Sequence, residues 1–165
     1  MEADAFVALA RAAAPSREEL EAAGLDEADI DEIRGSFACP TRPPSGASSD
    51  DDELSRLLHR YDCSRFELSM FRFVSPPTAH PTGRLVGWLE ADAVVQTPSG
   101  EVIVLDHESA DAPATVCART GVTFLDALGV RLRHGHGERS TELARACEQA
   151  AGVASPNPFW RTVAG

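Results

Sequence analysis

The sequence predicts an α+β fold, with N-terminal helices, a central antiparallel sheet of about 4-6 strands and C-terminal helices. Three observations support this prediction. Apolar residues recur at helical spacing up to about residue 60, approach alternation from residue 66, and return to helical spacing after Thr120. Because the expected helices and strands form separate blocks along the chain, their order is typical of α+β proteins.

Two helices are expected at the N-terminus. The first covers 3–14 and ends at Pro15, which cannot continue a helix. Ser16 and Glu19 then have the spacing of a capping box, in which each side chain accepts a hydrogen bond from the other residue's backbone. A second short helix should therefore begin there and end near Gly24.

Two more helices are expected on either side of a segment rich in proline and serine. Asp26 can cap the third helix, which carries Ile30 and Phe37 on its apolar side. Residues 39–51, CPTRPPSGASSDD, contain almost nothing apolar and predict a mobile loop. The fourth helix should follow over 52–60, where leucines recur at i, i+3 and i+4.

The sheet is expected in the middle of the chain. Pro98-Ser-Gly between two valine-rich runs predicts a hairpin turn. The segment SPPTAHPTG (75–83) predicts a loop, and Gly87 is a candidate bulge within the run 84–97, which forms two strands or one bent strand. The expected strands lie at about 66–74, 84–97, 101–106 and 114–118.

The C-terminal part should contain two helices. Thr120 can cap the first, and the second is expected over 138–151. The tail, 153–165, is expected to be irregular, with Phe159 and Trp160 docked back on the body. At 165 residues the chain is expected to form a single domain, 1–165.

The charge is unevenly distributed along the chain. Residues 1–55 hold 14 acidic and 4 basic residues, whereas residues 56–165 hold 12 and 11. The acidic N-terminal third repels the phosphate backbone of nucleic acids, so we expect no nucleic-acid binding. We expect instead that it attracts a basic protein partner. No apolar stretch is long enough to span a bilayer, so no membrane association is expected.

The acidic residues at the start of the sequence are unlike the basic start of a secretory signal. Four widely spaced cysteines then predict reduced, buried thiols in a cytoplasmic protein.

Asp106, His107 and Glu108 stand in a row and are the main candidates for chemistry. A loop could bring them together as a small hydrolase or metal-dependent site. Alternatively they are the polar end of a hairpin, with Asp106 capping the turn. His134-Gly-His136 offers two imidazoles without a visible third ligand. GxSxG, HExxH, GxxxxGK[ST] and GxGxxG are all missing, so enzyme activity is unsupported but not excluded by the motifs, and our expectation is a protein without enzyme activity, cofactor or metal.

A series of segments after Trp88 carries a family resemblance. A turn leads into GEVIVLDHESADAP (100–113), where a strand enters an acidic loop, and TVCA precedes the helix TGVTFLDALG with its apolar Phe124 and Leu128. This order resembles the SMI1/KNR4-type SUKH superfamily, whose members are usually interpreted as bacterial immunity proteins that neutralise toxins. The acidic helices GLDEADIDEI and DDELSRLL look like that family's N-terminal region. CSRFELSMFRF stands where the family commonly has Asn-Gly-Gly.

The resemblance implies a protein without an active site or cofactor, which acts by covering the surface of a toxin domain. Together with the charge asymmetry, it leads us to expect contact residues in two acidic stretches. These are Asp50, Asp51, Asp52, Glu53, Asp106, Glu108 and Asp111. Two alternatives stay open: an enzyme using His107 with Asp106 or Glu108, and a scaffold or adaptor in a larger assembly.

Overall fold

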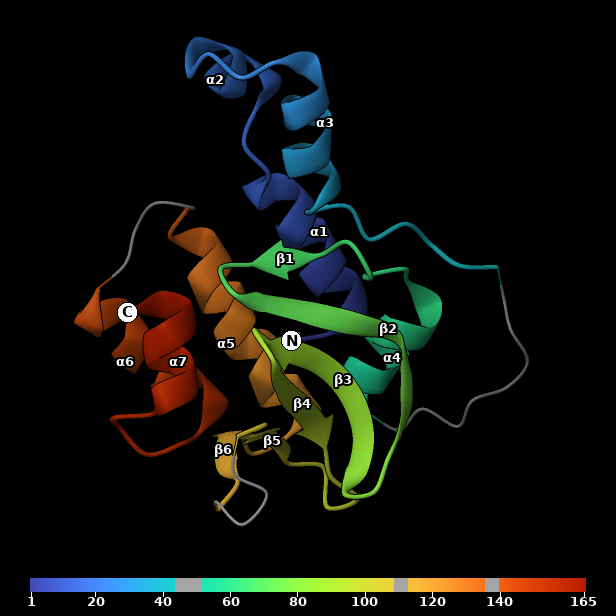
Figure 1. Ribbon diagram of the computed structural model, residues 1–165, viewed down its shortest axis with the longest axis vertical. Coiled ribbons are helices and arrows are strands. Elements are labelled where there is room, and N and C mark those ends of the chain that lie inside the picture. Colours follow the sequence, from blue (N-terminus) through green and yellow to red (C-terminus); the bar gives the residue numbers. More distant parts are fainter. Residues whose placement is uncertain (44–51, 109–112, 136–139) are drawn as a thin grey trace.

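The computed structural model describes residues 1–43, 52–108, 113–135 and 140–165. Within these residues four helices precede a six-stranded antiparallel sheet and three helices follow it, which confirms the α+β prediction. Each strand is hydrogen-bonded to the next one in the chain, so the sheet is a simple meander (Figure 1). None of the helices in the described ranges is both long and apolar enough to cross a lipid bilayer.

Two N-terminal helices and one C-terminal helix pack together beside the sheet. The first helix, α1 (Ala3–Ala13), packs on α4 (Glu53–Arg60) and on α5 (Gly121–Arg133). Phe6 of α1 is fully buried, and its ring lies 5.5 Å from that of Phe66 and 6.0 Å from that of Phe73. These contacts fix the helices against the start of the sheet.

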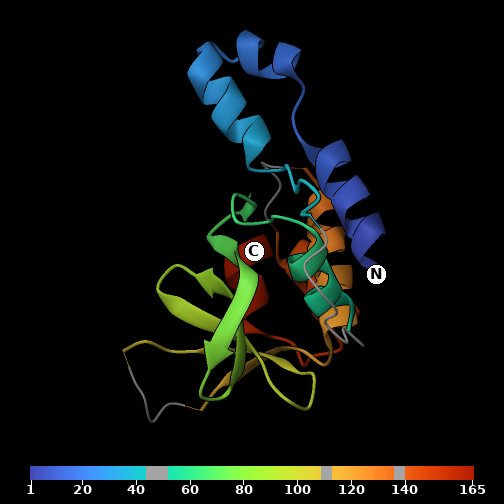
Figure 2. The ribbon, with the colours of Figure 1, turned by 90° about the vertical axis from the view of Figure 1, so that its right-hand side faces the viewer.

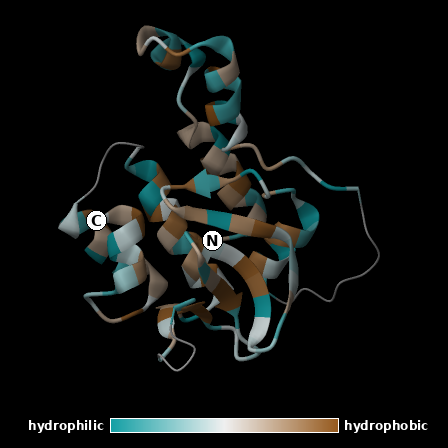
Figure 3. Cartoon of the chain, viewed as in Figure 1, coloured by the Kyte–Doolittle hydropathy of each residue, from teal (hydrophilic) through white to brown (hydrophobic). Residues whose placement is uncertain are grey.

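Residues 16–36 form a projection that we call the acidic arm. It contains α2 (Arg17–Ala22) and α3 (Glu27–Gly35), which stand away from the rest of the molecule (Figures 1 and 2). The predicted capping box is confirmed, because the Ser16 hydroxyl accepts from the Glu19 backbone and Glu19 accepts from the Ser16 backbone at 2.8 Å. Hydrophilic residues are frequent in the arm, whereas apolar ones dominate the central strands (Figure 3).

The strands follow the expected order. They are β1 (Glu67–Leu68), β2 (Phe71–His80), β3 (Gly83–Leu89), β4 (Asp92–Gln96), β5 (Val102–Leu105) and β6 (Thr115–Ala118). The hairpin at Pro98-Ser-Gly is confirmed, with the Thr97 backbone N–H donating to the Glu101 carbonyl at 2.8 Å. The bulge prediction is also confirmed, since the register of β3 and β4 shifts between Leu85 and Gly87.

The prediction of a loop over 75–83 is wrong for most of its length, because residues 75–80 belong to strand β2. Strand β2 continues to His80 and pairs with β3 through Thr78, Ala79 and His80 after a register shift. Pro76 and Pro77 fall within that shift and lack a backbone N–H. β1 pairs only with Phe71 and Arg72, so this part of β2 is an edge, where a missing donor is tolerated.

The prediction of an irregular tail over 153–165 is also wrong for the second half of that segment. Residues Pro158–Ala164 form helix α7, in which Asn157 is the N-cap and proline takes the first turn. The docking prediction is confirmed, because Phe159 and Trp160 are buried and the Trp160 indole N–H donates to the Cys117 carbonyl at 2.8 Å. α7 packs on α6 (Thr141–Ala151), which begins after the Ser140 cap.

The prediction that the cysteine thiols are buried is confirmed, and none of the four forms a disulfide. These residues are Cys39, Cys63, Cys117 and Cys147. Of the loop expected over 39–51, residues 39–43 are described, and Thr41 forms a β-bridge with Tyr61. The mobility predicted for the remainder lies outside the described residues.

A candidate site at the junction of strands β4 and β5

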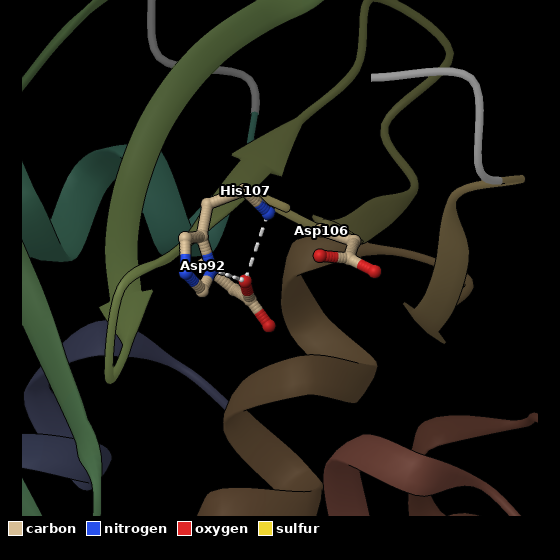
Figure 4. Close-up of side chains that lie close together, drawn as sticks. All are labelled: Asp92, Asp106 and His107. Atoms are coloured by element: carbon tan, nitrogen blue, oxygen red, sulfur yellow. Dashed lines mark hydrogen bonds and ion pairs between the residues drawn. The ribbon is translucent and has the colours of Figure 1, made fainter. Parts of the chain in front are cut away.

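The end of one hairpin brings Asp92 together with the adjacent residues Asp106 and His107, which follow it by 14 and 15 positions in the sequence. Strand β4 begins at Asp92, and β5 ends at Leu105, which is paired with Ala93. Because the two strands are antiparallel, the start of β4 lies beside the residues that follow β5. Asp92, Asp106 and His107 therefore converge at this edge (Figure 4).

His107 is attached to Asp92 by two hydrogen bonds. The imidazole Nδ1 lies 2.6 Å from Asp92 Oδ1, and the His107 backbone N–H donates to the same oxygen at 3.0 Å. The Asp106 carboxylate stands to one side (Figure 4) and accepts the backbone N–H of Glu108 at 2.8 Å. This last bond confirms the prediction that Asp106 caps the turn.

The electrostatics of the pair favour its charged form. The hydrogen bond to Asp92 raises the pKa of His107, and the charges of Asp92, Glu108 and Asp106 add to this effect. Partial burial acts to raise the pKa of Asp92, but the hydrogen bonds and charge of His107 outweigh it, so that this pKa is lowered. The His107 side chain is 52% exposed and that of Asp92 is 29% exposed, so solvent screens the pair.

A pocket of about 240 Å³ adjoins the two aspartates. It lies between the sheet and the start of α7, and its lining includes Asp92, Asp106, Thr115 and Phe159. Helix α7 therefore forms one wall of the candidate site, although the sequence predicted an irregular tail there.

Two kinds of chemistry are possible at this junction. One ligand atom from each of Asp92, Asp106 and His107 can be chosen so that all three lie within 4.8 Å of one another. Carboxylate oxygens and an imidazole nitrogen are ligands that divalent cations accept in proteins. Alternatively, Asp92 orients the imidazole through Nδ1 and leaves Nε2 toward solvent, 4.0 Å from Glu108. That arrangement resembles the carboxylate–imidazole part of a general acid–base pair.

Two of the expected contact residues, Asp52 and Asp106, lie near opposite ends of strand β4. The Asp52 carboxylate caps α4 by accepting from Leu54 and Ser55, and it accepts from the Gln96 side chain at 2.8 Å. Gln96 is the last residue of β4, whereas Asp106 lies beside Asp92, the first residue of β4. The five residues of β4 thus separate Asp52 from Asp106 by roughly 13 Å of strand.

The other expected contact residues also differ in their surroundings. Glu53 accepts the Ala3 backbone N–H at 2.9 Å and pairs with Arg56, and its side chain is only 18% exposed. Glu108 is 82% exposed and open to a partner. Asp50, Asp51 and Asp111 lie outside the described residues, as does His136 of the two-histidine candidate.

Asp92 is the residue of this site that sequence reasoning missed. The signal was present in the predicted hairpin, because a turn centred on Ser99 places position 92 opposite position 106. Compared with family models, with curated proteins and with solved structures, the chain matches none.

Proposed function

We propose that this protein is an immunity-type binding protein that acts in the cytoplasm and neutralises a cognate toxin by covering part of its surface. The observation that carries the proposal is the acidic arm. Residues 16–36 hold eight acidic residues against two arginines, on a projection that stands clear of the sheet (Figures 1 and 2). Such a surface attracts a basic partner at long range and orients it before contact. The resemblance after Trp88 supports the same class of function.

Only some carboxylates of the arm are available for a partner. Glu19 and Asp26 accept capping hydrogen bonds. Arg17 lies within 4 Å of carboxylates of Glu21, Glu27 and Asp31. A further three side chains have neither a hydrogen bond nor an ion pair among the described residues and are exposed. These three are Glu18, Asp29 and Glu32.

These three carboxylates are the first binding residues to test, with Asp106 and Glu108 as a second set. Glu18, Asp29 and Glu32 can be neutralised without removing a helix cap or an internal ion pair. Asp52 and Glu53 are less suitable, because their substitution would change the stability of α4 as well as any contact.

The test is co-expression with a toxin-like protein encoded beside the gene for this chain. We expect a stable complex and protection of the host cell. The triple variant Glu18→Gln, Asp29→Asn, Glu32→Gln should associate more slowly, with a weaker dependence of the association rate on salt. Glu67, Glu90 and Glu142, changed together to Gln, are the matched control, because this removes the same charge from exposed sites outside the arm.

Three results would contradict the proposal in different ways. Equal loss of association in both triple variants would exclude the arm as the specific contact. A stable complex without protection would indicate a scaffold or adaptor. Failure of the neighbouring product to bind at all would remove the immunity function.

A second candidate function is metal-dependent hydrolysis at the β4–β5 junction, favoured by the convergence of Asp92, Asp106 and His107. It predicts that Zn²⁺ or Mn²⁺ binds with one ion per chain and that Asp106→Asn weakens this binding. Calorimetric titration of the metal-free protein measures both. Glu142→Gln, far along the chain on α6, is the control for a general charge effect. Unchanged binding in Asp106→Asn would exclude this site.

A further inference from the structure

A short antiparallel ladder places two cysteines opposite each other. Thr41 and Tyr61 are bridge partners, flanked by hydrogen bonds from the Asp62 N–H to the Pro40 carbonyl and from the Arg42 N–H to the Arg60 carbonyl. This bonding pattern makes Thr41 and Tyr61 a non-hydrogen-bonded pair. Two residues further along each segment, the same register pairs position 39 with position 63.

The spacing of such pairs fits a disulfide. Opposite residues of a non-hydrogen-bonded pair have Cα atoms about 4.5 Å apart. Disulfides join Cα atoms that are about 4.4–6.8 Å apart. The side chains of Cys39 and Cys63 agree with this register, because the two thiols interact with each other and both are fully buried.

The two thiols are chemically unequal. The hydrogen bond from Cys63 lowers the pKa of Cys39, against a smaller opposing effect of burial, and the nearby charge of Arg11 lowers it further. The same hydrogen bond and burial raise the pKa of Cys63. Arg11 is held in place by a hydrogen bond to the Cys39 carbonyl at 3.2 Å. Cys39 is therefore the more readily ionised of the two thiols and takes the attacking role, whereas Cys63 takes the resolving role.

We propose that Cys39 and Cys63 are a site of oxidative modification, which hydrogen peroxide converts into an intramolecular disulfide. The Cys39 thiolate attacks one peroxide oxygen, and cleavage of the O–O bond gives a sulfenic acid and hydroxide. The Cys63 sulfur then attacks the Cys39 sulfur, so that an S–S bond forms and the S–O bond breaks. The protons of the two thiols end on the two oxygens as two water molecules, and the thiols supply both electrons.

The bond would tie the base of the acidic arm to the start of the sheet. Cys39 follows α3 after three residues, and Cys63 lies shortly before β1. Because both thiols are buried, peroxide reaches them when this segment opens locally. The closed loop would restrict the unfolded chain and stabilise the native one.

The test treats the purified full-length protein with hydrogen peroxide, blocks remaining thiols under denaturing conditions, and maps peptides by mass spectrometry without reduction. We expect a cross-link between Cys39 and Cys63 with the loss of two hydrogen atoms, reversed by dithiothreitol. The melting temperature should be roughly 10 °C higher in the oxidised protein than in the reduced one.

Matched variants separate this site from the other thiols. Cys39→Ser and Cys63→Ser should each abolish the cross-link. The double variant Cys117→Ser, Cys147→Ser should retain it, because these thiols lie on β6 and α6. The peptide map of the unaltered protein stands even if a serine variant folds poorly. A cross-link to Cys117 or Cys147, oxidation to a sulfinic acid without any cross-link, or a disulfide that lowers the melting temperature would overturn the proposal.

Discussion

His107 Nδ1 lies 2.6 Å from Asp92 Oδ1, although the two residues belong to different strand ends of the β4–β5 hairpin. The backbone N–H of His107 donates to the same oxygen at 3.0 Å, so the carboxylate fixes both the ring and the start of the loop. The hydrogen bond to Asp92 raises the pKa of His107 more than the charges of Asp106 and Glu108 do.

Asp92→Asn should lower the pKa of His107 toward its ordinary value of 6.5, because the hydrogen bond to Asp92 is the main cause of the raised value. The imidazole Cε1–H resonance followed by NMR against pH measures this, with His107→Gln used to assign the signal. Glu108→Gln removes a weaker influence and should have a smaller effect. An unchanged pKa in Asp92→Asn would show that the pair does not persist in solution.

The same pair gives a sign for the dependence of stability on pH. The pKa of His107 is raised in the folded protein, so its contribution is fully present below the unfolded value of 6.5 and is lost as pH rises through the folded value. The pKa of Asp92 is lowered, so its contribution is present above the unfolded value of 3.8 and is lost as pH falls through the folded value. The difference in unfolding free energy between the parent protein and Asp92→Asn should therefore be largest between these two unfolded values and shrink outside them, as measured by urea denaturation. A difference independent of pH would contradict the ion pair.

Local signals in the sequence were sufficient for most elements. The caps at Ser16, Asp26 and Thr120 are present as predicted, since a cap depends only on residues three or four apart. The Pro98-Ser-Gly turn fixed the β4–β5 register for the same reason.

The errors arose where tertiary context decides the outcome. Pro76 and Pro77 argued for a loop, but they occupy the part of β2 that lies at the sheet edge, and edge position cannot be seen in a local pattern. The signal for α7 was present as Asn157-Pro158, which is typical of a helix start. The short length of α7 hid it, because a seven-residue helix is stable only when it packs on α6 and β6.

Trp160→Ala should lower the free energy of unfolding by about 3–5 kcal/mol, because it empties a fully buried position of α7. Trp160→Phe retains most of the ring but leaves the Cys117 carbonyl without its donor, and should cost about 1–3 kcal/mol. Chemical denaturation measures both. Val122→Ala, at an exposed apolar residue of α5, should stay within about 0.5 kcal/mol. Equal effects in all three variants would mean that α7 is not docked.

Asp52→Ala and Glu108→Gln should differ sharply in stability, although the sequence assigned both residues to the expected contact set. Asp52 caps α4 and accepts from the buried Gln96 amide, so its loss should cost about 2–4 kcal/mol. Glu108 is exposed, and its neutralisation should change stability by less than about 0.5 kcal/mol. Urea denaturation of both variants provides the comparison. A stable Asp52→Ala protein would return Asp52 to the set of carboxylates available to a partner.

Gly87→Ala should destabilise the protein by about 1–3 kcal/mol, because a Cβ atom there would lie 2.6 Å from the Phe71 ring and 2.7 Å from the Arg72 carbonyl oxygen. The ring can move only by disturbing its edge contact with Phe124, whose centroid is 5.5 Å away. Phe71→Leu removes the ring and creates space, so the double variant should be less destabilised than the sum of the single variants by about 0.5–3 kcal/mol. A thermodynamic cycle of the four proteins, measured by urea denaturation, gives this coupling energy. If the two substitutions were additive, the close approach of the bulge to Phe71 would not be the reason that glycine is required.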